Sequence, residues 1–212
     1  MPGWGCESCA SQPHEPGSFA PGLRFLAAPP LLDGKAYAEV LTMQRNPRVQ
    51  GLFDAAAAAA CEELFDAYGV VLERISLPGA LAEGLAYCGI LGFAGPSVRG
   101  TCLLATTEGP LVDSDPVGGP SRDWMGELVN QLVGRIKNRV LSHGVEFYVT
   151  IPVVLRGQHI APLPRPDLPP LAFGAPRGQV LVWIEIETAA GFEPSVVPIP
   201  NESAAEGETL IF

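Results

Sequence analysis

Hydrophobic and polar residues recur with two different periods along this chain, and these periods divide it into helices and strands. A helical pattern runs from residue 52 to 69, "LFDAAAAAACEELFDAYG", in which alanine, the best helix former, fills the centre. Gly69 stands where helices commonly end in a left-handed residue. A second helix is predicted from Arg122 to about Ser142, where the dipeptide His143–Gly144 ends it. The run of alanines favours close packing against a flat surface such as a sheet.

Strand-like segments lie between and after these helices. "VVLERISL", "LAYCGILGFAG" and "GTCLLATTE" precede the second helix, and "GPSVRG" predicts a hairpin turn between the last two. "VEFYVTIPVVLRG" and "GQVLVWIEIE" follow it. The segments "GPLVDSDPVGGPS" (109–121) and "APLPRPDLPPLAF" are rich in proline, glycine or aspartate and predict irregular structure. This order predicts an α+β fold, a mostly antiparallel sheet with two long helices packed on one face.

The same pattern predicts one folded domain between two extensions. Residues 49–190 carry the helices and strands, 1–48 form a partly disordered N-terminal extension, and 191–212 form a C-terminal tail. With 47% hydrophobic and 17% charged residues, the chain has enough apolar surface for one sizeable core. The last strand is long, apolar and C-terminal, which favours an edge strand that needs cover.

Charge and hydropathy exclude several partners. The formal net charge is -10, which argues against nucleic acid and anionic membrane surfaces. The sequence contains no run of 18 apolar residues, so no transmembrane helix is predicted, and the N-terminus lacks the pattern of a secretory signal. We therefore expect a cytoplasmic protein.

The cysteines fall into two groups. Cys61, Cys88 and Cys102 lie in apolar segments and are expected to be buried free thiols. Cys6 and Cys9 form C-x-x-C near His14, which could begin a zinc site, but no second ligand pair follows at the usual spacing. A disordered tail is the favoured interpretation there, and we expect no bound metal.

The second helix carries the most informative polar face. Its apolar residues form one broad stripe, and Glu127 and Asn130, three positions apart, project from the opposite face. Asp123 and Gln131 share that face, and Gly134 removes a side chain one turn beyond Asn130. Periodicity alone favours ordinary solvated surface for this face. The alternative is a pair of functional groups directed at a partner.

The sequence around this pair resembles a known family. "DWMGELVNQLVGRIKNRVLSHGVEFYVTIPVVLRG" is similar to the signature region of the CheX-type chemotaxis phosphatases, relatives of CheC and FliY. Upstream, "GFAGPSVRGTCLLATTE" resembles the family's strand-turn-strand. The resemblance spans roughly residues 50–188, and its signature residues are Asp123, Glu127, Asn130, Gly134, Pro152 and Gly157, with Gly95 and Gly100 upstream. The family usually has a further helix before the signature helix, where residues 109–121 predict none.

The resemblance implies dephosphorylation of a phosphorylated response-regulator receiver domain of the CheY type. It assigns Asn130 to positioning the attacking water and Glu127 to pairing with the regulator's lysine, with Asp123, Gln131 and Gly134 around them in partner binding. The receiver would supply its own Mg²⁺, so no cofactor of this chain is expected. The resemblance also implies a homodimer. Two alternatives stay open: a non-catalytic module of the same fold that docks a receiver or another signalling partner, and a dimeric scaffold whose motif is incidental.

Overall fold

The structure is a computed structural model, and it describes residues 43–76, 84–162 and 167–195. The predictions for residues 1–42, which include the Cys6–Cys9 pair, and for residues 196–212 lie outside the described residues. The elements in chain order are α2 (Pro47–Asp66), β1 (Glu73–Arg74), β2 (Tyr87–Ala94), β3 (Val98–Thr106), α3 (Glu108–Ser114), α4 (Ser121–Leu141), β4 (Tyr148–Val149), β5 (Val153–Arg156), β6 (Leu171–Ala175) and β7 (Gly178–Thr188).

The strands form one antiparallel sheet in the order β1-β6-β7-β3-β2-β4, with β5 also pairing with β2. The β2–β3 hairpin pairs Tyr87 with Thr106 and Ala94 with Arg99, and the Gly95 amide donates to the Val98 carbonyl at 2.7 Å. The predicted hairpin is therefore confirmed.

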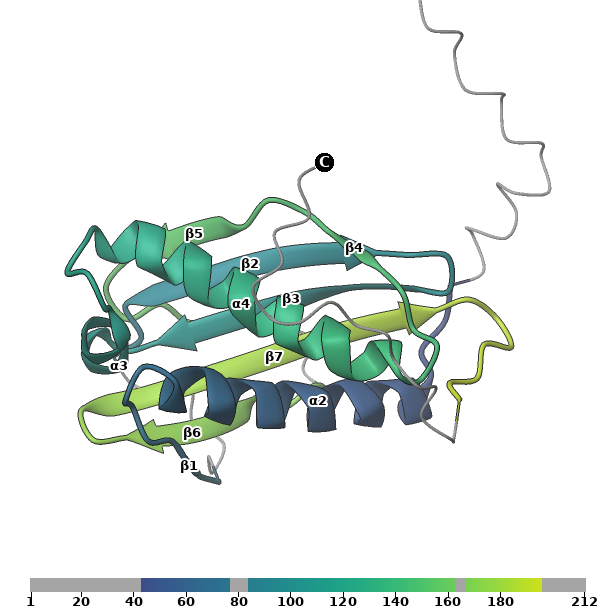
Figure 1. The fold of residues 1–212 in the computed structure, drawn as a ribbon, viewed down its shortest axis with the longest axis horizontal. Helices are drawn as coiled ribbons and strands as arrows, with labels where there is room; N and C mark the ends of the chain where they lie inside the picture. The colour runs from purple at the N-terminus through teal and green to yellow at the C-terminus, as the bar shows by residue number, and fades with distance from the viewer. Residues whose placement is uncertain (1–42, 77–83, 163–166, 196–212) are drawn as a thin grey trace, which may run out of the picture.

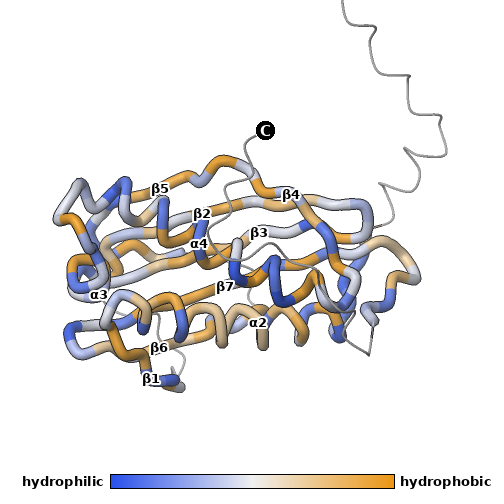
Figure 2. Tube along the Cα trace, viewed as in Figure 1, coloured by the Kyte–Doolittle hydropathy of each residue, from blue (hydrophilic) through white to orange (hydrophobic). Residues whose placement is uncertain are grey.

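Both long helices lie side by side on one face of this sheet, as predicted (Figure 1). Their inward residues and the facing strand residues form the main core, in which the rings of Phe53 and Phe93 stack at 5.8 Å and Phe147 packs against both. Ala57, Ala58 and Ala60 are buried in α2, which confirms the close packing expected of the alanine run. Figure 2 shows the resulting pattern: the central strands are largely hydrophobic, while hydrophilic segments recur along α4.

The two predicted helix ends are confirmed in detail. Gly69 and Gly144 have φ of 76°, the left-handed region that glycine adopts without strain. After α2, the Val70 amide donates to the Phe65 carbonyl at 2.9 Å, and after α4 the Val145 amide donates to the Val140 carbonyl at 3.3 Å. These bonds satisfy helix carbonyls that would otherwise lack a donor.

One segment predicted to be irregular contains a helix. Residues 108–114 form α3, so this chain does have a helix between β3 and α4. Pro110 lies in the first turn, where a missing N–H costs no helical hydrogen bond. Leu111 and Ser114 are buried, and tertiary packing of this short face outweighs a composition that favours turns.

The final strand is not an edge strand, which corrects a second prediction. β7 lies between β6 and β3, paired along its length with β3 from Val98↔Thr188 to Thr106↔Val180. Residues 171–173, "LAF", stand in the segment predicted to be irregular, yet they begin β6, which pairs with the outer side of β7.

The outer side of β2 carries two short strands in place of one long one. β4 and β5 both pair with β2, and Pro152, which has no amide hydrogen for the ladder, stands between them. Tyr148, Val149, Ile151, Val153 and Leu155 are all exposed here, Ile151 at 88%. We call these five residues the β4–β5 strip. It forms one edge of the described sheet.

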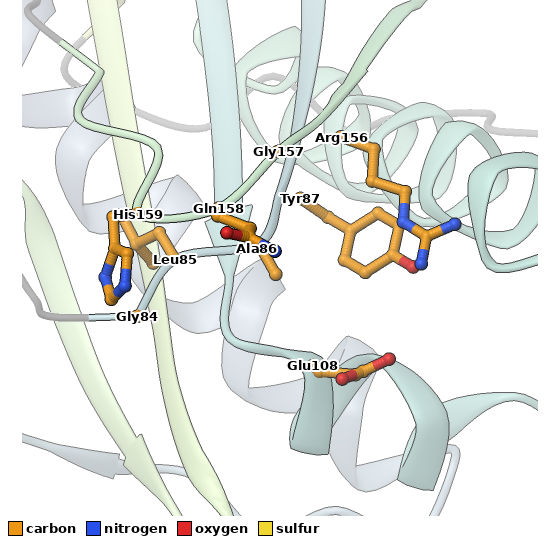
Figure 3. A pocket seen from close by; sticks show the side chains of 9 residues that line it. All are labelled: Gly84, Leu85, Ala86, Tyr87, Glu108, Arg156, Gly157, Gln158 and His159. Atoms are coloured by element: carbon orange, nitrogen blue, oxygen red, sulfur yellow. The ribbon is translucent and has the colours of Figure 1, made fainter.

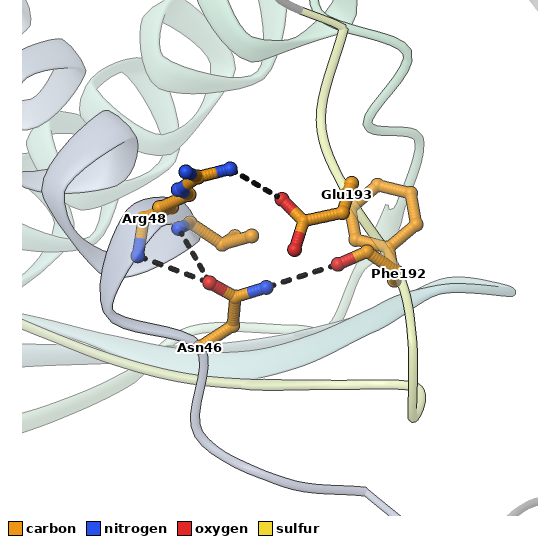
Figure 4. A network of polar contacts seen from close by, with 5 residues as sticks. Asn46, Arg48, Phe192 and Glu193 are labelled. Atoms are coloured by element: carbon orange, nitrogen blue, oxygen red, sulfur yellow. Dashed lines mark hydrogen bonds and ion pairs between the residues drawn. The ribbon is translucent and has the colours of Figure 1, made fainter.

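The segments at both ends of the domain are tied to the fold. Gln44 pairs with Thr188 through two backbone hydrogen bonds of 2.8 Å. Asn46 caps α2 through its side-chain oxygen, and its Nδ2 donates to the Phe192 carbonyl at 2.9 Å, beside an Arg48–Glu193 ion pair (Figure 4).

Candidate functional site

Helix α4 presents two chemically different sides. Met125, Leu128, Val129, Leu132, Val133, Ile136 and Val140 are buried against the sheet and α2, as the predicted stripe requires. Asp123, Glu127 and Asn130 are exposed, and Gln131 and Gly134 are half-buried beside them. The structure thus brings all five predicted site residues together on the solvent-facing side of one helix.

Among the residues that the structure describes, the side-chain amide of Asn130 is free to bind a partner. Its side chain is exposed and has no hydrogen-bond partner among the residues that the structure describes. A primary amide offers two donors and one acceptor oxygen, and it does not titrate. Asn130 therefore presents a complete set of donors and acceptor to any molecule that approaches α4.

Glu127 is held in place by its neighbours. Gln131 Nε2 donates to Glu127 Oε1 at 2.8 Å, and the Tyr68 hydroxyl donates to Gln131 Oε1 at 3.0 Å. Glu127 and Gln131 are one helical turn apart on α4, whereas Tyr68 lies just beyond the end of α2. An exposed glutamate has thereby acquired a fixed partner.

The residues behind Tyr68 anchor it to buried structure. Its ring meets the Trp124 ring edge-on, with centroids 4.8 Å apart and planes at 89°. Trp124 Nε1 donates to Ser114 Oγ at 3.0 Å, and Ser114, 1% exposed, lies in α3. The helix that the sequence did not predict thus supports the site. Sequence reasoning also missed Tyr68, whose one signal is its place before the helix-ending Gly69.

Two features of this face cost local stability. A Cβ built at Gly134 would meet no other atom within 4 Å beyond its own helix backbone, so close helix packing does not explain the glycine. Glycine inside a helix costs about 0.5–1 kcal/mol relative to alanine. Asp123 and Glu127 are like charges one turn apart, a spacing that costs about 0.2–0.5 kcal/mol. The open space at Gly134 leaves room for a partner to approach the helix.

The basic end of α4 is occupied by intramolecular pairs. Arg135 and Arg139 both contact the Glu63 carboxylate of α2. The hydrogen bond from the Arg139 guanidinium lowers the pKa of Glu63. These cations thus join α4 to α2 and complement the helix C-terminus.

A hollow of about 500 Å³ lies elsewhere, between the start of β2, the start of α3 and the segment after β5, and none of the five site residues lines it. The Arg156 guanidinium lies over the Tyr87 ring, 5.5 Å from its centroid. Figure 3 shows this pair above Glu108, which stands at the start of α3. Glu127 and Asn130 stand apart from this hollow on an exposed helix face.

Three further findings concern the described ranges. No group of three or more His, Cys, Asp or Glu side chains is arranged to hold a metal ion in 43–76, 84–162 or 167–195. No helix in those ranges is long and apolar enough to cross a membrane. Cys61, Cys88 and Cys102 are buried free thiols, as predicted, and burial raises the pKa of Cys88 to about 11 and that of Cys102 to about 12.

Comparison with known proteins gives a structural likeness. No family model and no curated sequence matches the chain. The crystal structure of the chemotaxis protein CheX from Vibrio vulnificus matches with a TM-score of 0.56 and 20% identity, over 63% of this chain and 98% of that one. A CheC-like superfamily protein from Shewanella sp. PV-4 matches with a TM-score of 0.56 and 21% identity, over 64% and 97%.

A chemotactic CheC-like protein from Shewanella oneidensis MR-1 matches with a TM-score of 0.53 and 18% identity, over 64% of this chain and 97% of that one. Each of these proteins is thus covered almost from end to end. Over 63–64% of its length, this chain has the fold of CheX and CheC-like chemotaxis proteins.

Proposed function

We propose that this protein dephosphorylates the phosphorylated receiver domain of a cytoplasmic response regulator of the CheY type. The observation that carries the proposal is the paired exposure of Glu127 and Asn130 on α4, one group hydrogen-bonded to Gln131 and the other with a free amide among the described residues. The shared fold with chemotaxis proteins supports the choice of partner.

Hydrolysis of a receiver's aspartyl phosphate needs only one further group from this protein. A receiver's aspartyl phosphate is an activated acyl phosphate, and its charge is neutralised by the Mg²⁺ that the receiver itself carries. The remaining requirement is a water molecule held in line with the phosphorus atom. The Asn130 oxygen would accept a hydrogen bond from that water while its NH₂ group donates to a phosphoryl oxygen. Glu127 would pair with a lysine beside the phosphoaspartate and so set the position of Asn130.

The two residues should therefore affect different kinetic constants. Asn130→Ala removes the group that orients water, so we expect kcat to fall about 10²-fold or more with KM nearly unchanged. Glu127→Ala removes a docking contact, so KM should rise with a smaller change in kcat. Phosphate release from a phosphorylated receiver, measured over a range of receiver concentrations, gives both constants.

A non-catalytic docking module is the second outcome of this experiment. In that case the wild-type protein would bind the receiver without speeding its decay, and both substitutions would weaken binding alone. If the protein neither binds nor accelerates decay of any receiver from the same genome, the exposed pair is ordinary surface and the proposal fails.

The proposal includes a homodimer. β7 is internal, so it provides no pairing edge. The β4–β5 strip instead exposes five apolar side chains along a sheet edge, and we expect a second copy to cover it. Light scattering at micromolar concentration should give twice the monomer mass, and Ile151→Lys should reduce it to the monomer mass. A wild-type monomer would contradict this assignment.

A further inference from the structure

Two side chains of α4 and one from the turn after α2 form a directed hydrogen-bond relay that ends on Glu127. Tyr68 lies beyond the end of α2, and Gln131 and Glu127 lie on α4, yet the two hydrogen bonds that join them are 3.0 and 2.8 Å long. Asn130 takes no part in the relay. The relay thus concerns one of the two proposed functional groups and leaves the other free.

The chemistry of the three groups fixes the direction of every hydrogen bond. An ionised carboxylate only accepts, so the NH₂ group of Gln131 must face Glu127. The Gln131 oxygen then faces Tyr68, whose hydroxyl must donate. One Glu127 oxygen, Oε1, is consequently occupied, and Oε2 is left for a cation outside the chain.

The first residue of the relay, Tyr68, is anchored by its neighbours. Tyr68 is held by the left-handed turn at Gly69 and by the edge-on contact with Trp124, which is itself bonded to the buried Ser114. A free glutamate loses rotamer freedom when it docks, and that loss weakens binding. A Glu127 side chain already ordered by Gln131 loses less.

We propose that Tyr68 and Gln131 are positioning residues that hold the Glu127 carboxylate in the geometry in which it receives the partner's cation. This inference rests on the proposed function and extends it from the exposed pair to a residue in the turn after α2. Neither side chain is required to touch the phosphate, because each acts through Glu127.

Two conservative substitutions test the relay. Tyr68→Phe keeps the ring against Trp124 and removes only the hydroxyl, and Gln131→Met keeps the length of the side chain and removes its amide. Each should raise KM for the phosphorylated receiver about 3- to 10-fold, the effect of one partly exposed hydrogen bond, with kcat unchanged. Gln50→Met is the control: Gln50 Nε2 donates to Asp54 Oδ1 at 2.8 Å and to the Ile184 carbonyl at 2.9 Å, and neither partner lies on α4, so the loss of its amide should leave both constants unaltered.

A double-mutant cycle separates positioning from general structural support. In a Glu127→Ala background, Tyr68→Phe and Gln131→Met should raise KM no further, because the group they position is gone. An independent reading comes from the Gln131 side-chain amide resonances, which should shift in both Tyr68→Phe and Glu127→Gln without any partner present.

The outcomes distinguish the inference from the proposed function. If Glu127→Ala raises KM while Tyr68→Phe and Gln131→Met do not, the relay has no positioning role and the proposed function stands. A further rise in KM in the Glu127→Ala background would also overturn the inference, since the residues would then act elsewhere. A wild-type protein without effect on any receiver removes the proposed function and this inference together.

Discussion

Alanine at Gly134 should make the protein more stable and less active. Gly134 lies inside α4, and a Cβ there meets no other atom within 4 Å beyond the helix backbone, so Gly134→Ala introduces no clash in the free protein. The substitution removes the helix-interior cost of glycine, about 0.5–1 kcal/mol. For a domain of this size that corresponds to a rise in Tm of about 1–4 °C.

The same methyl group would stand where the partner approaches α4. A closely packed interface that must accommodate an added methyl loses about 1 kcal/mol or more, which raises KM about fivefold or more. We expect kcat at saturating receiver to change less, because Asn130 keeps its position. The assay pairs thermal unfolding with the receiver concentration dependence of phosphate release.

Gly126 supplies the matched control on the flank of the same helix that faces β5. Gly126 is buried, and a Cβ there would lie 3.6 Å from Val154 Cγ2 and 3.9 Å from Pro152 Cγ, ordinary contact distances. Gly126→Ala should raise Tm by a similar amount without changing KM. If Gly134→Ala raises Tm and leaves KM unchanged, the partner does not approach this part of the helix and the reasoning about Gly134 is refuted.

Three further predictions concern the core, the thiols and the response to acid. Phe53 is fully buried and stacks on Phe93, so Phe53→Ala should lower the free energy of unfolding by about 3–5 kcal/mol in chemical denaturation, and a loss below about 1 kcal/mol would contradict the described core. In a Cys6→Ser, Cys9→Ser variant, the three buried thiols should react with a disulfide reagent at pH 8 only after unfolding, because burial raises their pKa; rapid labelling of the native protein would show that they are accessible. The hydrogen bond from Arg139 lowers the pKa of Glu63, so this ion pair stabilises the folded protein above the unfolded pKa of about 4.3, and that stabilisation is lost as the pH falls toward the folded pKa. Glu63→Gln should therefore destabilise the protein at pH 7 and have little effect near pH 2. An equal loss of stability at both pH values would contradict the ion pair.

Periodicity predicted those parts of the fold in which side-chain pattern and local propensity agree. The alanine-rich α2, the apolar stripe of α4 and the glycine that ends each helix all follow from local sequence. α3 and the start of β6 did not, because both lie in segments whose proline and glycine content favours turns. Leu111 and Phe173 become buried there only through contacts with distant parts of the chain.

The candidate site likewise contains residues that the local pattern predicted and one that it did not. Glu127 and Asn130 were found because they share one helix, where spacing fixes direction. Tyr68 is 63 positions from Gln131 in sequence, and nothing in the local pattern connects them. The pairing of β7 with both β6 and β3 was likewise beyond reach, because the pattern of a buried strand does not identify its neighbours.

The most direct test of the central claim is the dephosphorylation rate of a phosphorylated receiver at saturating concentrations of this protein, compared with its Asn130→Ala variant. The account predicts that the wild type accelerates decay and that the variant, which still saturates at a similar concentration, loses about 10²-fold or more of that acceleration. Equal rates for the two proteins would contradict it, because the exposed amide would then take no part in the chemistry.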